Sequence, residues 1–527
     1  MPVDETRYLT VAWEMMTRGD WVLPTLNYNP YSHKPPLIFW LIHASWEIFG
    51  VHVAVARAVI FAAVAALLML IARLTRLIYP EQPHAPIIAV LLMCAMPAYL
   101  TYGGMIMFDS LLALFVLGAM IIIWRAGQAD DRKNWILLGF VTGFGILAKG
   151  PVALVYILPV ALLAPFWIHD RIVNWRKWFL GVLVAVMLAI TIGLAWSMPA
   201  AVEGGVWYAE RLFFAQSAGR MVDAFDHKEP FWFYIPALII FVFPFLVWPS
   251  LWKATRSYFI ADQKSRFLIC WVIPAFLFFS FISSKSIHYV IPFLPGLAIL
   301  IAGILSRHKI ENPESVRIPI IAMMIPSAIA LVAHFTGMTV GGFSFSDNGI
   351  LLAVTHLLAS VVLYWWAGKH TDRPLHALVI GSALLVVMMH AQLGPEFLKR
   401  YDLSAAAHEL HKYENRPWAA APKYDGEYGF VARTDRQFFP LGRENIDWWF
   451  EHNPDGIIIG RYSEHTLPNP DFYTTLYQQP FRKKEFIVIF EKKKGSTRGW
   501  EKDWGSYRKF FYDYTIYGPH LGGKIYK

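Results

Sequence analysis

Long apolar runs dominate the chain from Val51 to about Gly394 and then stop. Most are close to the length of about 20 residues that an α-helix needs to cross a hydrocarbon core roughly 30 Å thick. Several are shorter or lie close together, so the alternative for the pairs around Asp109 and Lys149 is a helical hairpin with a tight turn. The pattern predicts spans at 52–72, 86–102, 107–124, 135–148, 151–168, 178–198, 231–252, 267–283, 288–305, 318–337, 349–368 and 376–393. We therefore expect an α-helical polytopic membrane protein with about 12 transmembrane helices over residues 51–393.

The pattern changes outside this region. From about residue 394 to 527 the chain is polar, and short apolar stretches such as 456–460 and 486–491 lie between Pro, Asn, Asp and Gly, as is typical of strands. This predicts a small water-facing α/β domain. Before the first span, residues 7–21 and 37–50 have the pattern of amphipathic helices that lie at a membrane interface, within a first loop of residues 1–50.

Lys and Arg residues near the span ends predict the topology. The basic connections hold Arg73, Arg76, Arg125, Arg132, Lys133, Arg171, Arg176, Lys177, Lys253, Arg256, Lys264, Arg266, Arg307, Lys309, Arg317, Lys369 and Arg373. Because cytoplasmic loops carry the excess of Lys and Arg, these connections are cytoplasmic. The 1–50 segment, the 199–230 loop and the 394–527 domain are then periplasmic. This location requires a further helix before Asp4, thirteen in all.

Composition excludes a soluble fold, because 56% of the residues are hydrophobic and only 16% are charged, against about 25% charged in soluble proteins. The net charge of +9 is spread over short loops. Membrane topology explains it better than nucleic-acid binding. Cys94 and Cys270 lie inside apolar runs, which favours small buried side chains over a disulfide or a metal pair.

Polar residues gather on the predicted outer side. They are Asp4, Glu5, Arg7, His33, Lys34, Asp109, Lys149, the segment from Arg220 to Lys228 and the segment from Lys285 to Tyr289. An ionisable group at a span end costs free energy unless it is paired or meets water, so a one-sided set predicts a polar cavity. The alternatives are that Lys149 and Lys285 reach the interface individually and that Asp4 only caps a helix.

Such a cavity suits the transfer of a sugar from a polyprenyl phosphate. Basic side chains must neutralise the departing phosphate, and a carboxylate must orient the acceptor or take its proton. Asp4 and Asp109 are the candidate acids. The candidate phosphate-binding residues are Lys34, Lys149, Arg220 and Lys285.

The order of these motifs resembles that of the membrane-embedded GT-C glycosyltransferases. The matching motifs are Val3 to Tyr8, Gly19 to Trp21, His33 to Pro36, Asp109, Lys149 with Gly150, Pro230 to Tyr234, and Lys285 to Pro292. Within that group the chain resembles the bacterial branch that is related to protein O-mannosyltransferases and the lipid A aminoarabinose transferase. The resemblance implies thirteen spans, a periplasmic active site and a C-terminal periplasmic domain.

The resemblance also implies roles for individual residues. Asp4 would be the catalytic acid and Lys34 the ligand of the donor phosphate, while Asp109, Lys149 and Tyr289 would form the cavity wall. Glu5 and Arg7 belong to the first motif and are expected to bind substrate.

One departure concerns His33, which stands where the aminoarabinose transferases have Glu before Lys-Pro. The same sugar and metal site therefore do not follow from the resemblance. His33 and His227 are candidates for a divalent-metal or hydrogen-bonding pair, with ordinary interfacial histidines as the alternative. No cofactor is assigned beyond this metal.

These observations predict a glycosyltransferase of the bacterial inner membrane. It would move a hexosyl or pentosyl group from a polyprenyl-phosphate donor to an envelope acceptor at the periplasmic face. Lipid A or the lipopolysaccharide core is the first choice of acceptor and protein the second. The rival interpretation is a flippase or transporter of lipid-linked sugars, which would place polar groups near the bilayer midplane and show related halves.

Overall fold

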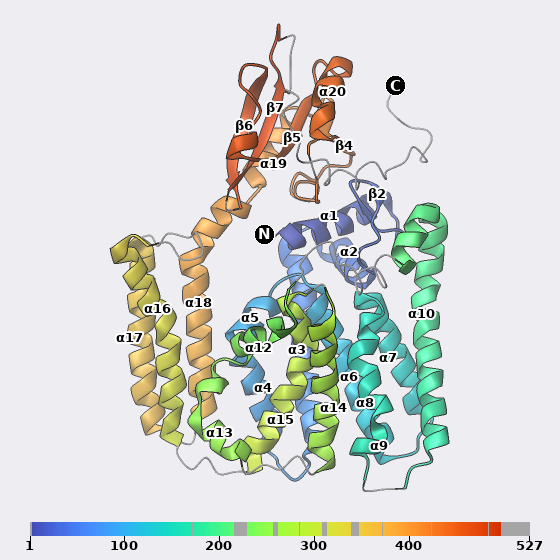
Figure 1. Ribbon diagram of the computed structural model, residues 1–527, viewed down its shortest axis with the longest axis vertical. Helices are drawn as coiled ribbons and strands as arrows, with labels where there is room; N and C mark the ends of the chain where they lie inside the picture. The colour runs from blue at the N-terminus through green and yellow to red at the C-terminus, as the bar shows by residue number, and fades with distance from the viewer. Residues whose placement is uncertain are drawn as a thin grey trace. The chain divides into compact units, whose positions relative to one another are not determined.

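The apolar runs form helices in the computed structural model of the chain (Figure 1). The structure describes residues 3–169, 172–214, 229–256, 262–283, 285–307, 313–338, 347–370, 373–422, 424–482 and 484–496. The chain divides into a helical unit, Ser32–Gly394, and a terminal unit that combines Met1–Tyr31 with Pro395–Lys527.

Eight helical stretches among the described residues are long and apolar enough to cross a membrane. They are α3 (Val53–Ile78), α6 (Phe108–Gln128), α10 (Trp175–Glu210), α14 (Gln263–Phe281), η4 with α15 (Ile287–Phe293 and Leu294–Arg307), α16 (Arg317–Thr336), α17 (Asp347–Lys369) and α18 (Pro374–Tyr401). A bent pair, α4 (Ala85–Cys94) and α5 (Pro97–Gly103), makes a ninth if it is one span. The chain is therefore a multi-span α-helical membrane protein, as predicted, and the numbers of twelve and thirteen spans stay predictions.

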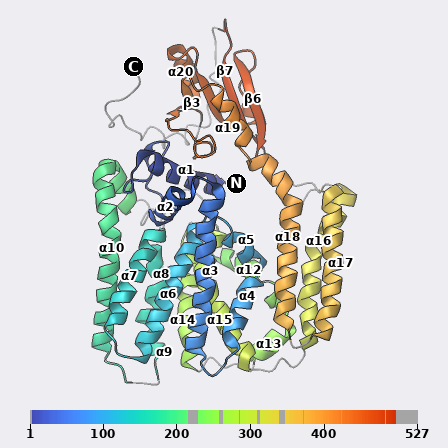
Figure 2. The ribbon, with the colours of Figure 1, turned by 180° about the vertical axis from the view of Figure 1, so that it is seen from behind.

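Shorter helices complete the helical unit. They are α2 (Leu37–Phe49), α7 (Lys133–Lys149), α8 (Val152–Leu162), α9 (Ala164–Trp167), α12 (Tyr234–Val242), α13 (Pro249–Arg256), η2 (Phe231–Phe233), η3 (Phe245–Val247) and η5 (Pro313–Val316). Small residues let neighbouring helices approach closely. A Cβ atom added at Gly139 or Gly143 of α7 would lie within 3 Å of Leu188 or Ile192 of α10, so these two helices pack side by side (Figure 2).

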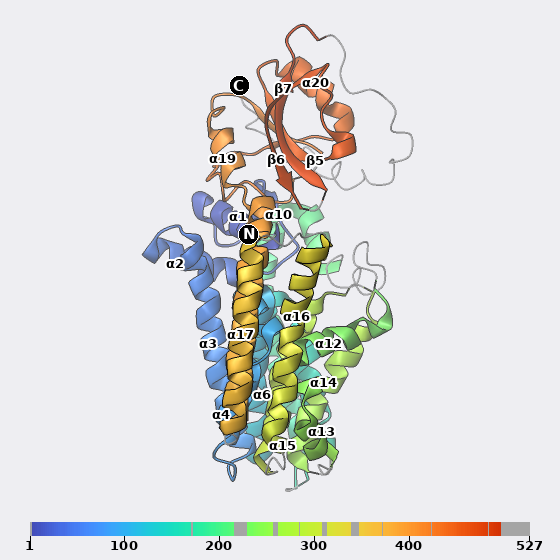
Figure 3. The same ribbon diagram turned by 90° about the vertical axis from the view of Figure 1, so that its left-hand side faces the viewer.

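The terminal unit contains a five-stranded sheet with the order β4, β3, β5, β7, β6. Its strands β5, β6 and β7 are labelled in Figure 3. The strands are β3 (Trp418–Ala420), β4 (Phe439–Pro440), β5 (Ile457–Ser463), β6 (Tyr473–Phe481) and β7 (Glu485–Lys492). β3 is parallel to β4 and β5, whereas β7 is antiparallel to β5 and β6. The strands predicted at 456–460 and 486–491 are confirmed, since β5 covers 457–460 and β7 covers 486–491.

Successive side chains of β5 point to opposite faces of the sheet, and both faces are apolar. Ile457 and Ile459 pack with α19 (Ser404–His411) on one face, while Ile458 packs with α20 (Ile446–His452) on the other. The remaining helical turns of the sheet domain are η6 (Arg443–Asn445) and η7 (Glu464–Thr466). The predicted small C-terminal α/β domain is therefore confirmed.

The terminal unit also includes the beginning of the chain. α1 (Val3–Arg18) is followed by a short hairpin of β1 (Thr25–Leu26) and β2 (Asn29–Pro30). The helix predicted at 7–21 thus begins four residues earlier. Asp4 and Glu5 lie in its first turn, where negative charge is favourable to the helix dipole.

Candidate functional site

A buried ion pair joins the beginning of α6 to the end of α7. Asp109 is in the first turn of α6, and its carboxylate Oδ1 pairs with the Nζ atom of Lys149, the last residue of α7. The side chains are only 2% and 8% exposed. The acid lies at a helix N-terminus and the base at a helix C-terminus, the arrangement that both helix dipoles favour.

A third segment, η4, brings two more side chains to this pair. The Nε2 atom of His288 lies 3.6 Å from Asp109 Oδ2. The Lys149 ammonium lies 4.4 Å from the ring centroid of Tyr289, and the hydroxyl of Tyr156 donates a hydrogen bond to the Tyr289 carbonyl at 2.8 Å. Tyr289 is therefore held at its main chain while its ring contacts the cation.

Lys34 approaches the same place from the segment before α2. Its Nζ atom lies 5.5 Å from the ring centroid of Phe108, the residue before Asp109. We call Lys34, Asp109, Lys149, His288 and Tyr289 the Asp109 cluster. The structure thus brings together four residues that the sequence singled out and adds His288, whose position within the Lys285 to Pro292 motif was the available signal.

Lys285, a further candidate, has different surroundings. Lys285 donates hydrogen bonds to two main-chain carbonyls, that of Ile282 at 2.5 Å and that of Glu229 at 2.9 Å, so its ammonium stabilises the ends of two segments. Arg220 and His227 lie outside the described residues. Within the described ranges no group of three or more His, Cys, Asp or Glu residues could hold a metal ion, and His33 is exposed.

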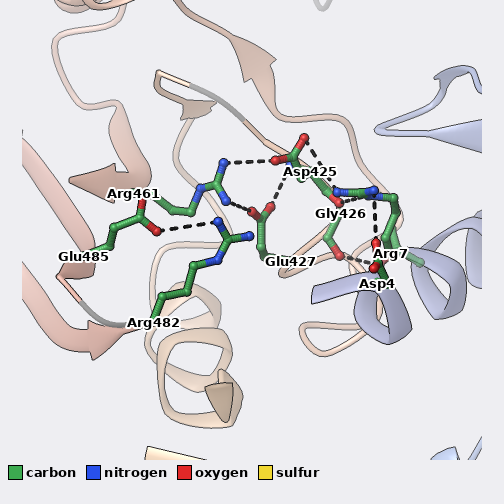
Figure 4. Close-up of polar contacts among 9 residues, drawn as sticks. Asp4, Arg7, Asp425, Gly426, Glu427, Arg461, Arg482 and Glu485 are labelled. Atoms are coloured by element: carbon green, nitrogen blue, oxygen red, sulfur yellow. Dashed lines mark hydrogen bonds and ion pairs between the residues drawn. The ribbon is translucent and has the colours of Figure 1, made fainter. Parts of the chain in front are cut away.

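Asp4, Glu5 and Arg7 belong to the terminal unit, and the side chains of Asp4 and Arg7 face each other (Figure 4). The Asp4 side chain is 57% exposed, and its Oδ1 atom lies 3.3 Å from Arg7 Nη1. Glu5 is buried. Asp4 is therefore a solvent-accessible carboxylate next to a guanidinium, in contrast to the enclosed Asp109.

A buried carboxylate holds the turn that follows α1. Glu14 accepts hydrogen bonds from the Thr25 hydroxyl at 2.8 Å and from the main-chain N–H groups of Asn27 at 2.7 Å and Tyr28 at 2.8 Å. Asn27 and Tyr28 have φ angles of 55° and 58°, which are uncommon for residues other than Gly. Burial raises the pKa of Glu14 to about 7, although these hydrogen bonds oppose the rise.

Glu14 is expected to make stability depend on pH. Its pKa is higher in the folded than in the unfolded chain, so the folded chain binds more protons between about pH 4.5 and about pH 7. The stabilisation is complete below this window and decreases as pH rises through it, by at most about 1.4 kcal/mol per pH unit. Thermal unfolding of wild type and Glu14→Gln at pH 5, 6 and 7 should show the stability difference changing with pH. A constant difference would contradict the assignment.

Comparisons with known proteins bear on this arrangement. Residues 33–196 match the family described as dolichyl-phosphate-mannose-protein mannosyltransferase. The undecaprenyl phosphate-alpha-4-amino-4-deoxy-L-arabinose arabinosyl transferase of Edwardsiella ictaluri is 31% identical over 60% of this chain and 57% of its own length. A Proteus mirabilis transferase of the same description is 31% identical over 57% of this chain and 54% of its own length. The chain thus spans somewhat more than half the length of these curated relatives.

The fold has a counterpart among solved structures. The crystal structure of ArnT from Cupriavidus metallidurans bound to undecaprenyl phosphate superposes with a TM-score of 0.70 at 20% identity. The match covers 92% of this chain and 93% of that one. The resemblance predicted from the motifs is therefore confirmed: the chain is related to the aminoarabinose transferases and shares the fold of the GT-C membrane proteins.

Proposed function

We propose that this relative of the aminoarabinose transferases moves a sugar from a polyprenyl-phosphate donor to an acceptor of the bacterial envelope. Lipid A or the lipopolysaccharide core is our first choice of acceptor, and protein, which the description of the family matched by residues 33–196 names, is the second. The observation that carries the proposal is the Asp109 cluster, in which a buried carboxylate, basic groups and an aromatic ring meet at the ends of helical segments.

The charges of the cluster suit a departing phosphate. The charge of Asp109 neutralises that of Lys149. Because Lys34 is also present, the net charge of the cluster is positive even when His288 is neutral. Cations strengthen their interaction with the phosphate as the glycosidic bond breaks and negative charge develops on it. We assign Lys34 to this contact, and Lys149 and Tyr289 to the wall of the donor pocket.

Asp4 is the proposed catalytic base. The acceptor oxygen attacks the anomeric carbon, its proton passes to the Asp4 carboxylate, and the bond from the anomeric carbon to the phosphate oxygen breaks with both electrons on the phosphate. Inversion at the anomeric carbon follows from this single displacement. Asp109 keeps its proposed catalytic role because it holds Lys149 in place. The proposed substrate-binding residues remain Glu5, Arg7, Arg220 and Lys285.

We place this reaction at the periplasmic face of the inner membrane. The alternation of Lys and Arg supports this side. The polar side chains of the cluster lie at the beginning of α6 and the end of α7, whereas a transporter of lipid-linked sugars would be expected to bind near the bilayer midplane. This position favours the transferase over the flippase.

Lys34→Ala is expected to weaken the donor interaction. The loss of one charge-assisted contact should raise KM for an undecaprenyl-phosphate-linked aminopentose by about 10- to 100-fold. Lys34→Arg keeps the charge with a different geometry and should retain part of the activity. Purified protein is supplied with this donor and lipid A, and the product is measured by mass spectrometry.

The matched control is Lys264→Ala, which removes a lysine paired with Glu81 on the predicted cytoplasmic side. It should leave KM unchanged. Wild-type protein that transfers no sugar from a polyprenyl phosphate to lipid A, core oligosaccharide or protein would overturn the proposed function. Wild-type kinetics for Lys34→Ala would overturn the role of Lys34.

A further inference from the structure

The helix that carries Asp4 is held by a loop more than 400 residues away in the sequence, the 424–438 loop of the same terminal unit. The Thr10 hydroxyl donates a hydrogen bond to the Gly426 carbonyl at 2.9 Å and accepts one from the Phe430 N–H at 3.0 Å. The Trp13 indole donates to the Thr434 carbonyl at 2.9 Å. Successive turns of α1 are therefore fixed to the main chain of this loop.

The hairpin after α1 is bound by the same loop. The Asn27 side-chain amide donates to the Phe438 carbonyl and accepts from the Phe438 N–H, both at 2.8 Å. Gly426 has a φ angle of +86°, and a Cβ atom there would lie 3.1 Å from the Cα atom of Arg7. The backbones approach so closely that a side chain at Gly426 would push the loop away from α1.

A chain of charged groups extends from the sheet to Asp4 (Figure 4). Arg461 on β5 contacts Asp425 at 2.9 Å and Glu427 at 3.2 Å. Arg7 donates through Nε to the Asp425 carbonyl at 3.0 Å, and its Nη2 atom lies 4.0 Å from the Asp425 carboxylate. The other end nitrogen of Arg7 pairs with Asp4.

Burial makes this network sensitive to the loss of one charge. Glu427 is fully buried, and burial raises its pKa against the lowering effect of Arg461. Burial opposes the charge on Arg461, yet Glu427 and Asp425 raise its pKa overall. With Arg7 and Asp4 included, the network holds three carboxylates and two guanidinium groups. Asp425 is the group between the two guanidiniums, so it links the sheet to α1.

We infer that Asp425 is a positioning residue for sugar transfer: together with Glu427 and Arg461 it sets the position of Arg7 and α1, and through them that of the Asp4 carboxylate. The inference rests on the proposed function, in which Asp4 takes the acceptor proton. The terminal sheet domain then contributes to the reaction by fixing the position of α1, the helix that carries Asp4. Because a displacement of about 1 Å in a reacting group can cost about 100-fold in rate, such support has a measurable effect on kcat.

The test is Asp425→Asn, which keeps the shape of the side chain and removes its charge. We expect kcat for transfer to lipid A to fall by about tenfold or more, with KM for the polyprenyl-phosphate donor within a few-fold of wild type. Asp425→Glu should recover part of kcat. The matched control is Asp447→Asn in the same unit, where the carboxylate binds Lys492 at 2.7 Å and the Tyr473 hydroxyl at 2.8 Å. The control should keep wild-type kcat.

A double variant separates positioning from general destabilisation. In the Asp4→Asn background, Asp425→Asn should cause little further loss, because the group that it positions is already absent. Equal kcat for Asp425→Asn and Asp447→Asn, or a full further loss in the double variant, would overturn the inference. An active Asp4→Asn enzyme would instead overturn the catalytic role of Asp4, so the two failures are distinguishable.

Discussion

Asp4→Asn is expected to lower the rate of sugar transfer by about 10²- to 10³-fold, the typical cost of losing an interaction that strengthens in the transition state. Asparagine keeps the size of the side chain but cannot take the acceptor proton. The carboxylate is 57% exposed and its ion pair with Arg7 spans 3.3 Å, and exposed pairs of this kind contribute little to stability. The variant should therefore fold, insert and bind the donor, and lose only kcat.

The measurement is single-turnover transfer to lipid A with saturating undecaprenyl-phosphate-linked sugar. Asp131→Asn is the control, because Asp131 is an exposed carboxylate that accepts a hydrogen bond from the Lys133 N–H at 3.0 Å at the beginning of α7. If Asp4 only caps its helix, both variants should behave alike, since Asn is as good a cap as Asp. Activity of Asp4→Asn within a few-fold of wild type would make Asp4 a structural residue.

The sequence predicted the helical unit well because hydropathy is a strong local signal for a membrane span. The sequence also placed Asp109 and Lys149 together on the predicted outer side of the membrane. They are 40 residues apart, but each borders an apolar run, and the connection between α6 and α7, residues 129–132, is short. Two consecutive antiparallel helices bring the beginning of the first and the end of the second together, so the pair follows from the topology.

The support of α1 could not be predicted in this way. Arg7, Thr10 and Trp13 all donate to main-chain carbonyls, and a carbonyl is present at every residue, so the partner sequence carries no matching pattern. The contacts of Lys285 could not be predicted for the same reason, since its ammonium donates to the main-chain carbonyls of Ile282 and Glu229. Long-range contacts to the backbone therefore account for what the motifs missed.

The second large effect is expected from a substitution in the ion pair of Asp109 and Lys149. Removal of one charge from a buried ion pair leaves the other uncompensated and typically costs about 3 to 5 kcal/mol. Asp109→Asn should therefore lower the thermal midpoint and the yield of folded protein as well as activity, because Lys149 is only 8% exposed. Loss of activity in this single variant would not distinguish a damaged fold from a damaged reaction.

The double variant Asp109→Asn with Lys149→Met makes that distinction. Both replacements are neutral and close in size to the native side chains, and the replacement of a whole buried pair is often neutral for stability. We expect the double variant to regain a thermal midpoint near that of wild type but to remain at least 100-fold slower in transfer, because the wall of the donor pocket has lost Lys149. Thermal unfolding in detergent and the lipid A assay measure the two properties on the same sample. If restored folding brings wild-type transfer with it, Asp109 and Lys149 serve only to join α6 to α7, and Lys34 is the one member of the cluster left with a proposed contact to the phosphate.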